Sequence, residues 1–203
     1  MATLILLSAI LCRSNDGFFS VTTECPILVG IFDGFSWIRC EGKGSFLNSP
    51  ALKAFGLERI TAGETRLVVD LQACTGMDST FMGTLAGMAS RLTAHEGAAL
   101  QIADASERNR HSLEDLGLDF LMEIDPKKAV WSASVEAIRA ALTPHRPAAA
   151  LGQIQQTKHV LDAHKVLSET NEQNLRAFSN VVTLLESELE TKQKRAETQG
   201  EKS

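Results

Sequence analysis

The sequence predicts an α/β fold in which a mixed β-sheet packs against helices, followed by a long C-terminal helix or helical hairpin. Three observations lead to this prediction. From Pro26 onward, apolar or β-branched runs alternate with segments of helical periodicity. Asp33-Gly34 separates the first two runs, and this pair is the strongest short-range signal for a hairpin, which makes the sheet mixed. From Ile154 to Arg195 the chain has neither Pro nor Gly and consists mostly of strong helix formers.

Five strands are expected in a domain that spans residues 25–145. Strand–helix alternation implies parallel pairing, with the helices against the sheet. The run from Thr65 to Leu71 is compact and β-branched, as expected of a central strand buried on both faces. We expect 42–44 to break the strand before it and 72–78 to be a polar turn after it. The expected strands are Ile27–Phe32, Phe35–Glu41, the central Thr65–Leu71, Ala98–Ala103 and, at the edge, Leu121–Ile124.

Four helices are expected in the same domain. Ser49 followed by Pro50 supplies a cap and a proline at the first helical position, and Ser106 caps a later helix. In the helix that begins at Ser79, apolar residues recur at spacings of four, three and four and form one stripe. One expected helix begins at Ser49, a second runs from Ser79 to about His95, and a third runs from Ser106 to about Leu116. The fourth, from Trp131 to Leu142, closes the domain.

The composition is that of a globular protein. The chain has 203 residues, of which 44% are hydrophobic and 22% charged, and its formal net charge is −5. Basic runs are too short to track a phosphate backbone and aromatic residues are scarce, so no nucleic-acid partner is predicted. The four cysteines are widely spaced without a Cys-x-x-Cys pair, which predicts no metal site and indicates reduced thiols in the cytoplasm.

Residues 1–24 are an N-terminal extension of the predicted domain. Met1 to Cys12 has an apolar core like that of a signal peptide, but no basic residue precedes it. The run is far shorter than the ~20 residues that span a bilayer, so no membrane association is predicted. A degenerate export signal, a disordered extension and an unused upstream start remain open, and the rest of the chain indicates a cytoplasmic protein.

The tail after the domain is expected to be helical. Residues 146–152 are a predicted linker, because two prolines in the run PHRP stop a helix. Residues 153–198 are a predicted helical, coiled-coil-like extension, and residues 199–203 a disordered end. From Leu151 onward the chain carries seven basic and eight acidic residues, which indicates a solvated face.

The heptad pattern of this extension is uneven. Leu175 to Leu189 makes a good seam, whereas the first half is interrupted by His164, Ser168 and Asn171. These polar residues either set the register of a coiled coil at a cost in stability or mark a helix break near 169–171. Because an isolated helix of this kind is marginal in water, we expect a homodimer through 154–192, a hairpin, or packing against the domain or a partner.

One stretch, from Leu67 to Leu92, carries the most specific pattern. A buried strand ends in Val69-Asp70-Leu71, and Met77-Asp78-Ser79-Thr80 follows before a helix of small and apolar residues. This stretch resembles the phosphorylation-site segment of the STAS family, the domain of bacterial anti-sigma-factor antagonists. Gly44 to Leu52 resembles the family's Gly-x-x-x-Asn-x-Pro-x-Leu helix entry, and Leu113 to Leu121 its last Leu-x-x-x-Gly-Leu turn. The resemblance covers most of the first 145 residues and none of the tail.

The resemblance implies a non-enzymatic regulatory switch. Ser79 would accept phosphate from a partner serine kinase of the anti-sigma-factor type, beside Thr80 as a poorer acceptor, while Asp78 shapes the loop. A PP2C-like phosphatase would be a further partner. The kinase would bring ATP and magnesium, so no cofactor of the chain itself is expected. The partner-binding residues would be Asp78, Ser79, Thr80, Phe81 and Met82.

The chemistry at Ser79 also follows from its position. At the N-cap or first turn of a helix, its hydroxyl is expected to be exposed. The unpaired N–H groups and partial positive charge of a helix N-terminus suit an added phosphate. A desolvated, unmatched charge in a docked interface costs roughly 2 to 5 kcal/mol. Phosphorylation could therefore switch binding. The purely structural alternative is that residues 78–80 only cap the helix.

Phe81 departs from the family pattern, which usually has Gly directly after Asp-Ser-Ser/Thr. Its ring lies either inward as core or outward as an apolar knob, and the outward position would change how a kinase docks. This departure leaves open whether the usual docking and modification occur.

Three other functions are weighed against the switch. A serine hydrolase would need a Gly-x-Ser-x-Gly motif and a His base, but 77–81 lacks both glycines and the five histidines are scattered. A STAS subunit of a lipid-transport ABC system resembles the antagonists in fold but docks permanently on an ATPase. A scaffold protein would be assembled through the helical tail.

Overall fold

The structure is a computed structural model that describes residues 26–145 and 151–200. The predicted extension 1–24 lies outside the described residues, as do 146–150 of the predicted linker and the last residues, 201–203. The strands are β1 (Ile27–Phe32), β2 (Phe35–Cys40), β3 (Gly42–Gly44), β4 (Arg66–Asp70), β5 (Cys74–Met77), β6 (Ala99–Ala103), β7 (Glu123–Ile124) and β8 (Thr143–His145). The helices are α1 (Ser49–Thr61), α2 (Ser79–Leu92), α3 (Glu107–Asp115), α4 (Val135–Ala141), α5 (Gln153–Thr170) and α6 (Glu172–Gly200), with a 3-10 turn at Leu118–Phe120.

The main sheet is mixed, as the sequence predicts. Its strands lie in the order β7-β6-β4-β2-β1-β8. β1 and β2 pair antiparallel around Asp33-Gly34, where Gly34 takes the left-handed φ of 79° that the tight turn requires. β2, β4, β6 and β7 pair parallel, and β7 is the predicted edge strand. The expected α/β class is therefore confirmed.

β4 lies at the centre because its side chains are apolar on both faces. Leu67, Val68 and Val69 are fully buried, and neighbouring residues point to opposite sides of the sheet. Val69 packs with the residues of α1 and α2, whereas Val68 packs with Trp37 and Trp131 on the other face. The domain thus has a core on each side of one sheet.

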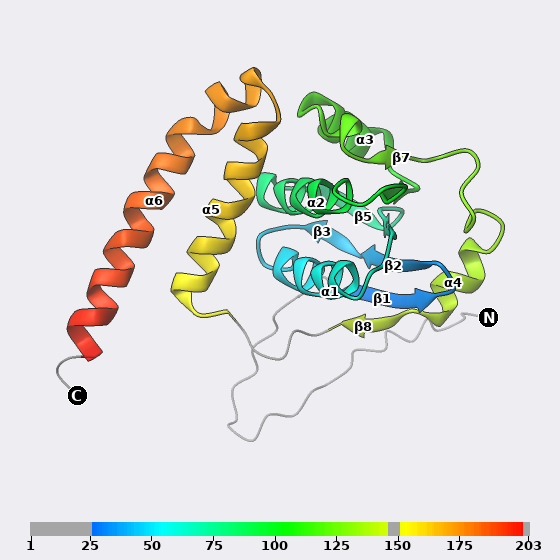
Figure 1. Cartoon of the computed structure of the whole chain (residues 1–203), viewed down its shortest axis with the longest axis horizontal. Helices are drawn as coiled ribbons and strands as arrows, with labels where there is room; N and C mark the ends of the chain where they lie inside the picture. The colour runs from blue at the N-terminus through cyan, green and yellow to red at the C-terminus, as the bar shows by residue number, and fades with distance from the viewer. Residues whose placement is uncertain (1–25, 146–150, 201–203) are drawn as a thin grey trace, which may run out of the picture.

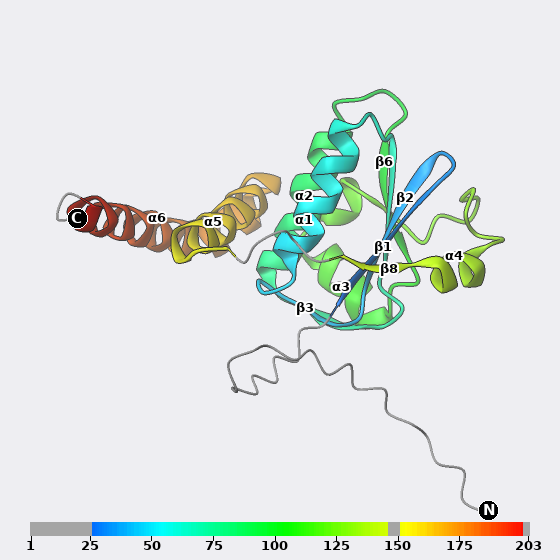
Figure 2. The same cartoon turned by 90° about the horizontal axis from the view of Figure 1, so that it is seen from below.

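The elements are stacked in layers. Figures 1 and 2 show α1 and α2 on one face of the sheet and α4 on the other. α5 lies over α2, and α6 lies over α5, farther from the sheet. The helical extension therefore folds back on its own domain as a hairpin. α5 ends at Thr170, and Asn171 caps α6 by accepting a hydrogen bond from the Asn174 backbone N–H at 2.8 Å.

An ion-pair cluster holds the carboxyl end of β4. The fully buried Asp70 carboxylate accepts hydrogen bonds from Arg39 at 2.7 Å and from Arg139 at 2.8 Å. Burial raises the pKa of Asp70, but hydrogen bonds from Arg139, from the Gln72 backbone and from Arg39 outweigh it and lower the pKa overall. Asp70 therefore joins α4 to the sheet as a charged, fully paired group.

The structure differs from the local expectations in five places. The expected break at 42–44 and the expected polar turn at 72–78 contain β3 and β5, which pair parallel in a small second sheet. Asn48, not Ser49, is the N-cap of α1, and its side chain is held by the loop before the helix. α4 is shorter than expected, and β8 was not expected. These short elements lack a repeating apolar pattern of their own, so their pairing depends on neighbouring segments.

Candidate functional site

The candidate site is the N-terminus of α2, directly after β5. Asp78 is the N-cap of this helix, and its Oδ1 accepts a hydrogen bond from the Phe81 backbone N–H at 2.8 Å. Its Oδ2 accepts a second hydrogen bond, at 2.9 Å, from the backbone N–H of Phe46 in the loop before α1. One carboxylate thus holds the beginning of α2 and the neighbouring loop together. Ser79 follows as the first residue of the helix, as the sequence predicts.

The hydroxyl of Ser79 is covered by the helical hairpin. Its Oγ lies 3.0 Å from Nε2 of His164 in α5, and Ser79 is half-buried. The expectation of an exposed hydroxyl is therefore wrong in this conformation, because α5 lies over the start of α2. Ser79 is nevertheless less buried than Thr80 beside it.

The hydrogen bonds of His164 indicate which group donates and which accepts in its contact with Ser79. Its Nδ1 lies 2.8 Å from the Val160 carbonyl oxygen, which can only accept. In the neutral imidazole Nδ1 therefore carries the proton, Nε2 accepts, and the Ser79 O–H donates to it. The His164 ring also packs edge-on against Phe178 of α6, with ring centroids 5.6 Å apart. His164 thus joins α2, α5 and α6.

A second serine–histidine contact lies at the N-terminus of α1. Ser49 Oγ is 2.8 Å from Nε2 of His159, one of the buried residues of α5. Burial, with a smaller contribution from the positive charge of Lys53, lowers the pKa of His159 to about 4. His159 is therefore neutral near pH 7. α5 carries both histidines and contacts a serine at the start of each helix.

Three of the other predicted site residues are buried. Thr80 and Met82 are buried, and Phe81 is fully buried in the core. The aromatic ring of Phe81 packs against Gly44, where an added Cβ would lie 2.9 Å from the ring. Of the two orientations left open for Phe81, the structure has the inward one. Its side chain is therefore core in this conformation and offers no contact to a partner.

α5 and α2 approach each other most closely at Gly83. A Cβ added there would lie 2.3 Å from the carbonyl oxygen of Ala163, so only glycine fits. One turn later, a Cβ added at Gly87 would meet only Val166 Cγ2, at an ordinary 3.7 Å. The close packing of these two helices therefore depends on one small residue of α2.

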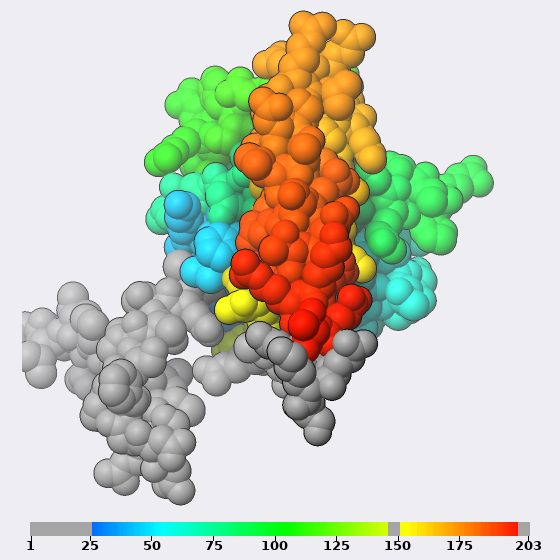
Figure 3. All heavy atoms as spheres, turned by 90° about the vertical axis from the view of Figure 1, so that its left-hand side faces the viewer, coloured from blue at the N-terminus to red at the C-terminus, as the bar shows by residue number. Residues whose placement is uncertain are grey.

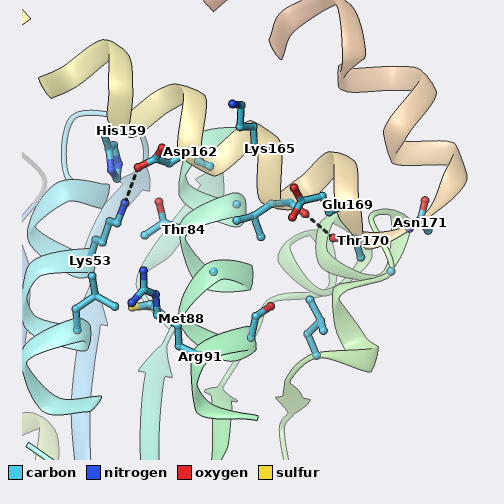
Figure 4. Close-up of a pocket in the computed structure, with 18 of the residues that line it drawn as sticks. Lys53, Thr84, Met88, Arg91, His159, Asp162, Lys165, Glu169, Thr170 and Asn171 are labelled. Carbon is cyan, nitrogen blue, oxygen red and sulfur yellow. Dashed lines mark hydrogen bonds and ion pairs between the residues drawn. The ribbon is translucent and has the colours of Figure 1, made fainter. Parts of the chain in front are cut away.

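A groove of about 980 Å³ runs along the junction of α2 and α5 (Figure 4). Its lining mixes charges, with Lys53, Arg91 and Lys165 beside Asp162 and Glu169, and Lys53 pairs with Asp162 at 3.4 Å. Such a lining shows no preference for one sign of ligand charge. In the part of the chain that the structure describes, no cluster of three His, Cys, Asp or Glu residues could hold a metal ion.

Sequence reasoning missed two features of this site. His159 and His164 were counted among scattered helical histidines, since nothing local links Ser79 to a residue 85 positions later. The neighbouring loop presents Phe46 and Leu47, which are 40% and 69% exposed beside Asp78. In the sequence, the adjacent large apolar residues Phe46 and Leu47 in the loop before a proline-started helix were the signal that could have suggested a contact surface.

Comparison with protein families assigns the domain that carries this site. The family model of the STAS domain matches residues 27–130, which are 104 of the 203 residues. The chain belongs to the STAS domain family. The match includes α1, β5, α2 and Ser79, and it ends before α5 and α6. The hairpin that covers Ser79 is thus an addition to the matched part of the STAS domain.

Solved structures similar to this chain include anti-sigma factor antagonists. A putative one from Thermotoga maritima is 16% identical, covering 55% of this chain and 92% of that one, with a TM-score of 0.46. One from Mycobacterium paratuberculosis is 22% identical over 56% and 92%, also at 0.46. The Bacillus cell fate determinant SpoIIAA in its phosphorylated form is 19% identical over 56% and 97%, at 0.43. At these values the likenesses carry no functional argument for this STAS domain.

Two further comparisons bear on the chain as a whole. The chain has no match among curated proteins. Among the helices in 26–145 and 151–200, none combines the length and apolar character needed to cross a bilayer.

Proposed function

We propose that this chain is a non-enzymatic protein-binding switch of the anti-sigma-factor-antagonist type, controlled by phosphorylation of Ser79 by a partner serine kinase. The observation that carries the proposal is the place of Ser79 in a STAS domain. It is the half-buried first residue of α2, and its hydroxyl contacts a helix that is not part of the family match. The partial positive charge at this end of a helix favours an added phosphate.

In the proposed reaction the kinase brings ATP and magnesium, and this chain brings the hydroxyl. Ser79 Oγ attacks the γ-phosphorus of ATP, so that a new Oγ–P bond forms and the bond to the ADP oxygen breaks. The hydroxyl proton passes to a base of the kinase, and ADP leaves. A PP2C-like phosphatase would reverse the switch by hydrolysing the new ester.

The partner is proposed to bind around Asp78 and Ser79. Phe46 and Leu47, which are exposed beside Asp78, would supply the apolar part of that surface. Phosphate would add about −1.5 to −2 charges there. An unmatched charge costing roughly 2 to 5 kcal/mol in a docked interface corresponds to about 30-fold to several thousand-fold in affinity.

The Ser79–His164 contact also raises a serine hydrolase as an alternative. A nucleophile and base at 3.0 Å satisfy one requirement of that chemistry. However, a backbone carbonyl rather than a carboxylate orients His164, and the neighbouring groove is lined by Gly83 and Thr84 but not by Ser79. A substrate in that groove would not meet the hydroxyl, so the switch is the better supported function.

Mass spectrometry of the chain purified from its native host tests the modification. We expect phosphate on Ser79, less or none on Thr80, and none at position 79 in a Ser79→Ala chain. A chain that carries no phosphate on Ser79 under any growth condition would contradict the proposal.

Binding to the partner tests the switch itself. Ser79→Asp should weaken binding by at least about 30-fold, the lower end of the range above. Ser79→Ala should bind permanently, because it cannot be modified. Equal affinity of both variants for the partner would count against a switch at this residue.

A further inference from the structure

We propose that the hairpin of α5 and α6 is an intramolecular cover for Ser79, and that α5 must leave α2 before a kinase can reach this hydroxyl. The inference rests on the proposed function of Ser79 and adds its regulation. α5 would block, within the same chain, the access of the kinase to this hydroxyl. Ser79 would then be available for phosphorylation only when the hairpin is undocked.

The contacts of α5 are placed at the two helix N-termini that form the candidate site. His164 Nε2 lies 3.0 Å from the Ser79 hydroxyl oxygen, and His159 Nε2 lies 2.8 Å from that of Ser49. Both histidines are buried, as are Leu161 and Leu167 of the same helix. The helix therefore uses polar and apolar contacts together, and the polar ones include the phosphate acceptor itself.

A phosphate on Ser79 does not fit this arrangement. The 3.0 Å between Ser79 Oγ and His164 Nε2 is filled by one hydrogen bond, and with the imidazole neutral, esterification removes the hydroxyl proton that makes it. His164 is held on its other sides by the Val160 carbonyl and the ring of Phe178. A phosphoryl group therefore requires α5 to be displaced, and by linkage phosphorylation keeps it displaced.

Movement of side chains alone does not open the site. At Gly83 the backbone carbonyl of Ala163 lies so close that an added Cβ would be 2.3 Å from its oxygen. Because backbone meets backbone one turn after Ser79, α5 has to move as a helix. α6 would move with it, since α6 packs on α5 and forms the outer face of the hairpin (Figure 3).

The hairpin carries contacts that support its movement as a unit. Lys192 of α6 donates a hydrogen bond to Thr157 of α5 at 2.8 Å, and Lys165 pairs with Glu186 at 2.7 Å. At the turn between the helices, the Asn174 side chain donates to the Leu116 carbonyl of the domain at 2.8 Å. The two helices are thus joined to each other along their length, and the turn between them is hydrogen-bonded to Leu116, the residue after α3.

Thiol labelling in the full chain tests whether α5 covers position 79. A Ser79→Cys chain is treated with N-ethylmaleimide, and labelling at residue 79 is followed by peptide mass spectrometry, so that other cysteines do not interfere. Ala163→Glu, which places a charge in the buried contact with α2, is combined with it. The matched control is Ala177→Glu, the same substitution on the exposed side of α6.

Ala163→Glu should speed labelling at residue 79 by at least about tenfold, because a buried unpaired charge favours the undocked hairpin. Ala177→Glu should leave the rate unchanged. Unaltered fluorescence of Trp37 and Trp131 would show that the domain stays folded in both variants. Equal labelling rates for the two variants, or loss of the fluorescence signal only with Ala163→Glu, would overturn the cover.

A chain with phosphoserine installed at position 79 by genetic code expansion tests the reciprocal effect. Amide hydrogen exchange in α5 should be at least about tenfold faster than in the unmodified chain, whereas unchanged exchange would contradict the proposal. Neither experiment needs the natural kinase. Absence of phosphate in the native host would therefore refute the proposed function alone, and unchanged labelling and exchange would refute the cover alone.

Discussion

The STAS domain and α6, the outer helix of the hairpin, bury their side chains to very different extents. In β4 the residues from Leu67 to Asp70 are all fully buried. In α6, Asn174 is the one buried side chain among those that the structure describes. A long helix with so little buried surface depends on the contacts of its neighbour, here α5. The comparison teaches that the domain has its own core, whereas the hairpin keeps its place through one interface.

The largest effect is expected where the domain is held by buried charge. Asp70→Ala would leave Arg39 and Arg139 without their buried partner, and should lower the free energy of unfolding by about 3 to 5 kcal/mol. Urea unfolding followed by tryptophan fluorescence measures this. The control is Glu136→Ala, which removes an 86% exposed partner of Arg139 and should cost under about 1 kcal/mol. Similar losses for both variants would contradict the role of Asp70.

A cavity in the interface should loosen the hairpin and spare the domain. Leu167 of α5 is fully buried against the domain core, so Leu167→Ala should weaken docking by about 2 to 5 kcal/mol. Hydrogen exchange should become faster in α5 while the amides of β4 keep their protection. Leu184→Ala, at a side chain that is 70% exposed, should change docking by less than about 0.5 kcal/mol. Equal acceleration in β4 and α5 would show that the two regions unfold together.

Lowering the pH should weaken the docking of the hairpin on the STAS domain, through protonation of His159. Docking keeps this imidazole neutral, with a pKa of about 4, against an ordinary value of 6.5 once the hairpin is free. The undocked form therefore binds more protons between these values, so docking is intact above pH 6.5 and weakens as the pH falls to 4. Among the facing groups, Lys53 disfavours the charged ring, while Asp162 and Asp78 favour it.

Amide exchange in α5, corrected for its intrinsic pH dependence, measures this effect. A His159→Gln chain should dock more weakly at pH 7 but lose most of the dependence between pH 6.5 and 4. If the wild-type dependence persists unchanged in this variant, another group is responsible.

The smallest effect is expected on the solvent side of the hairpin. Lys165 and Glu186 pair across α5 and α6 at 2.7 Å, but both side chains are close to half exposed. Lys165→Ala should therefore cause only a slight, salt-dependent change in the exchange of α6. Lys194→Ala, which removes a pair within α6, serves as the control. A salt-independent loss of docking would show that Lys165 has a larger role.

Much of the STAS domain could be predicted from local patterns. The hairpin at Asp33-Gly34, the buried strand before Asp70 and the start of a helix at Ser79 each depend on residues that are close in sequence. The short pair β3 and β5 could not be predicted, because neither segment has an alternating apolar pattern. The orientation of the Phe81 ring was left open for a different reason, because either face of α2 could have been covered.

What the sequence by itself determined is the mixed sheet, its helices and the position of Ser79 at the beginning of one of them. Hydrophobic periodicity, turn residues and capping residues act over a few positions, so they can be recognised along the chain. Only the tertiary structure decided that the tail folds back and that His164 meets Ser79. That contact joins residues 85 positions apart, and it depends on backbone packing between Gly83 and Ala163, which no local pattern encodes.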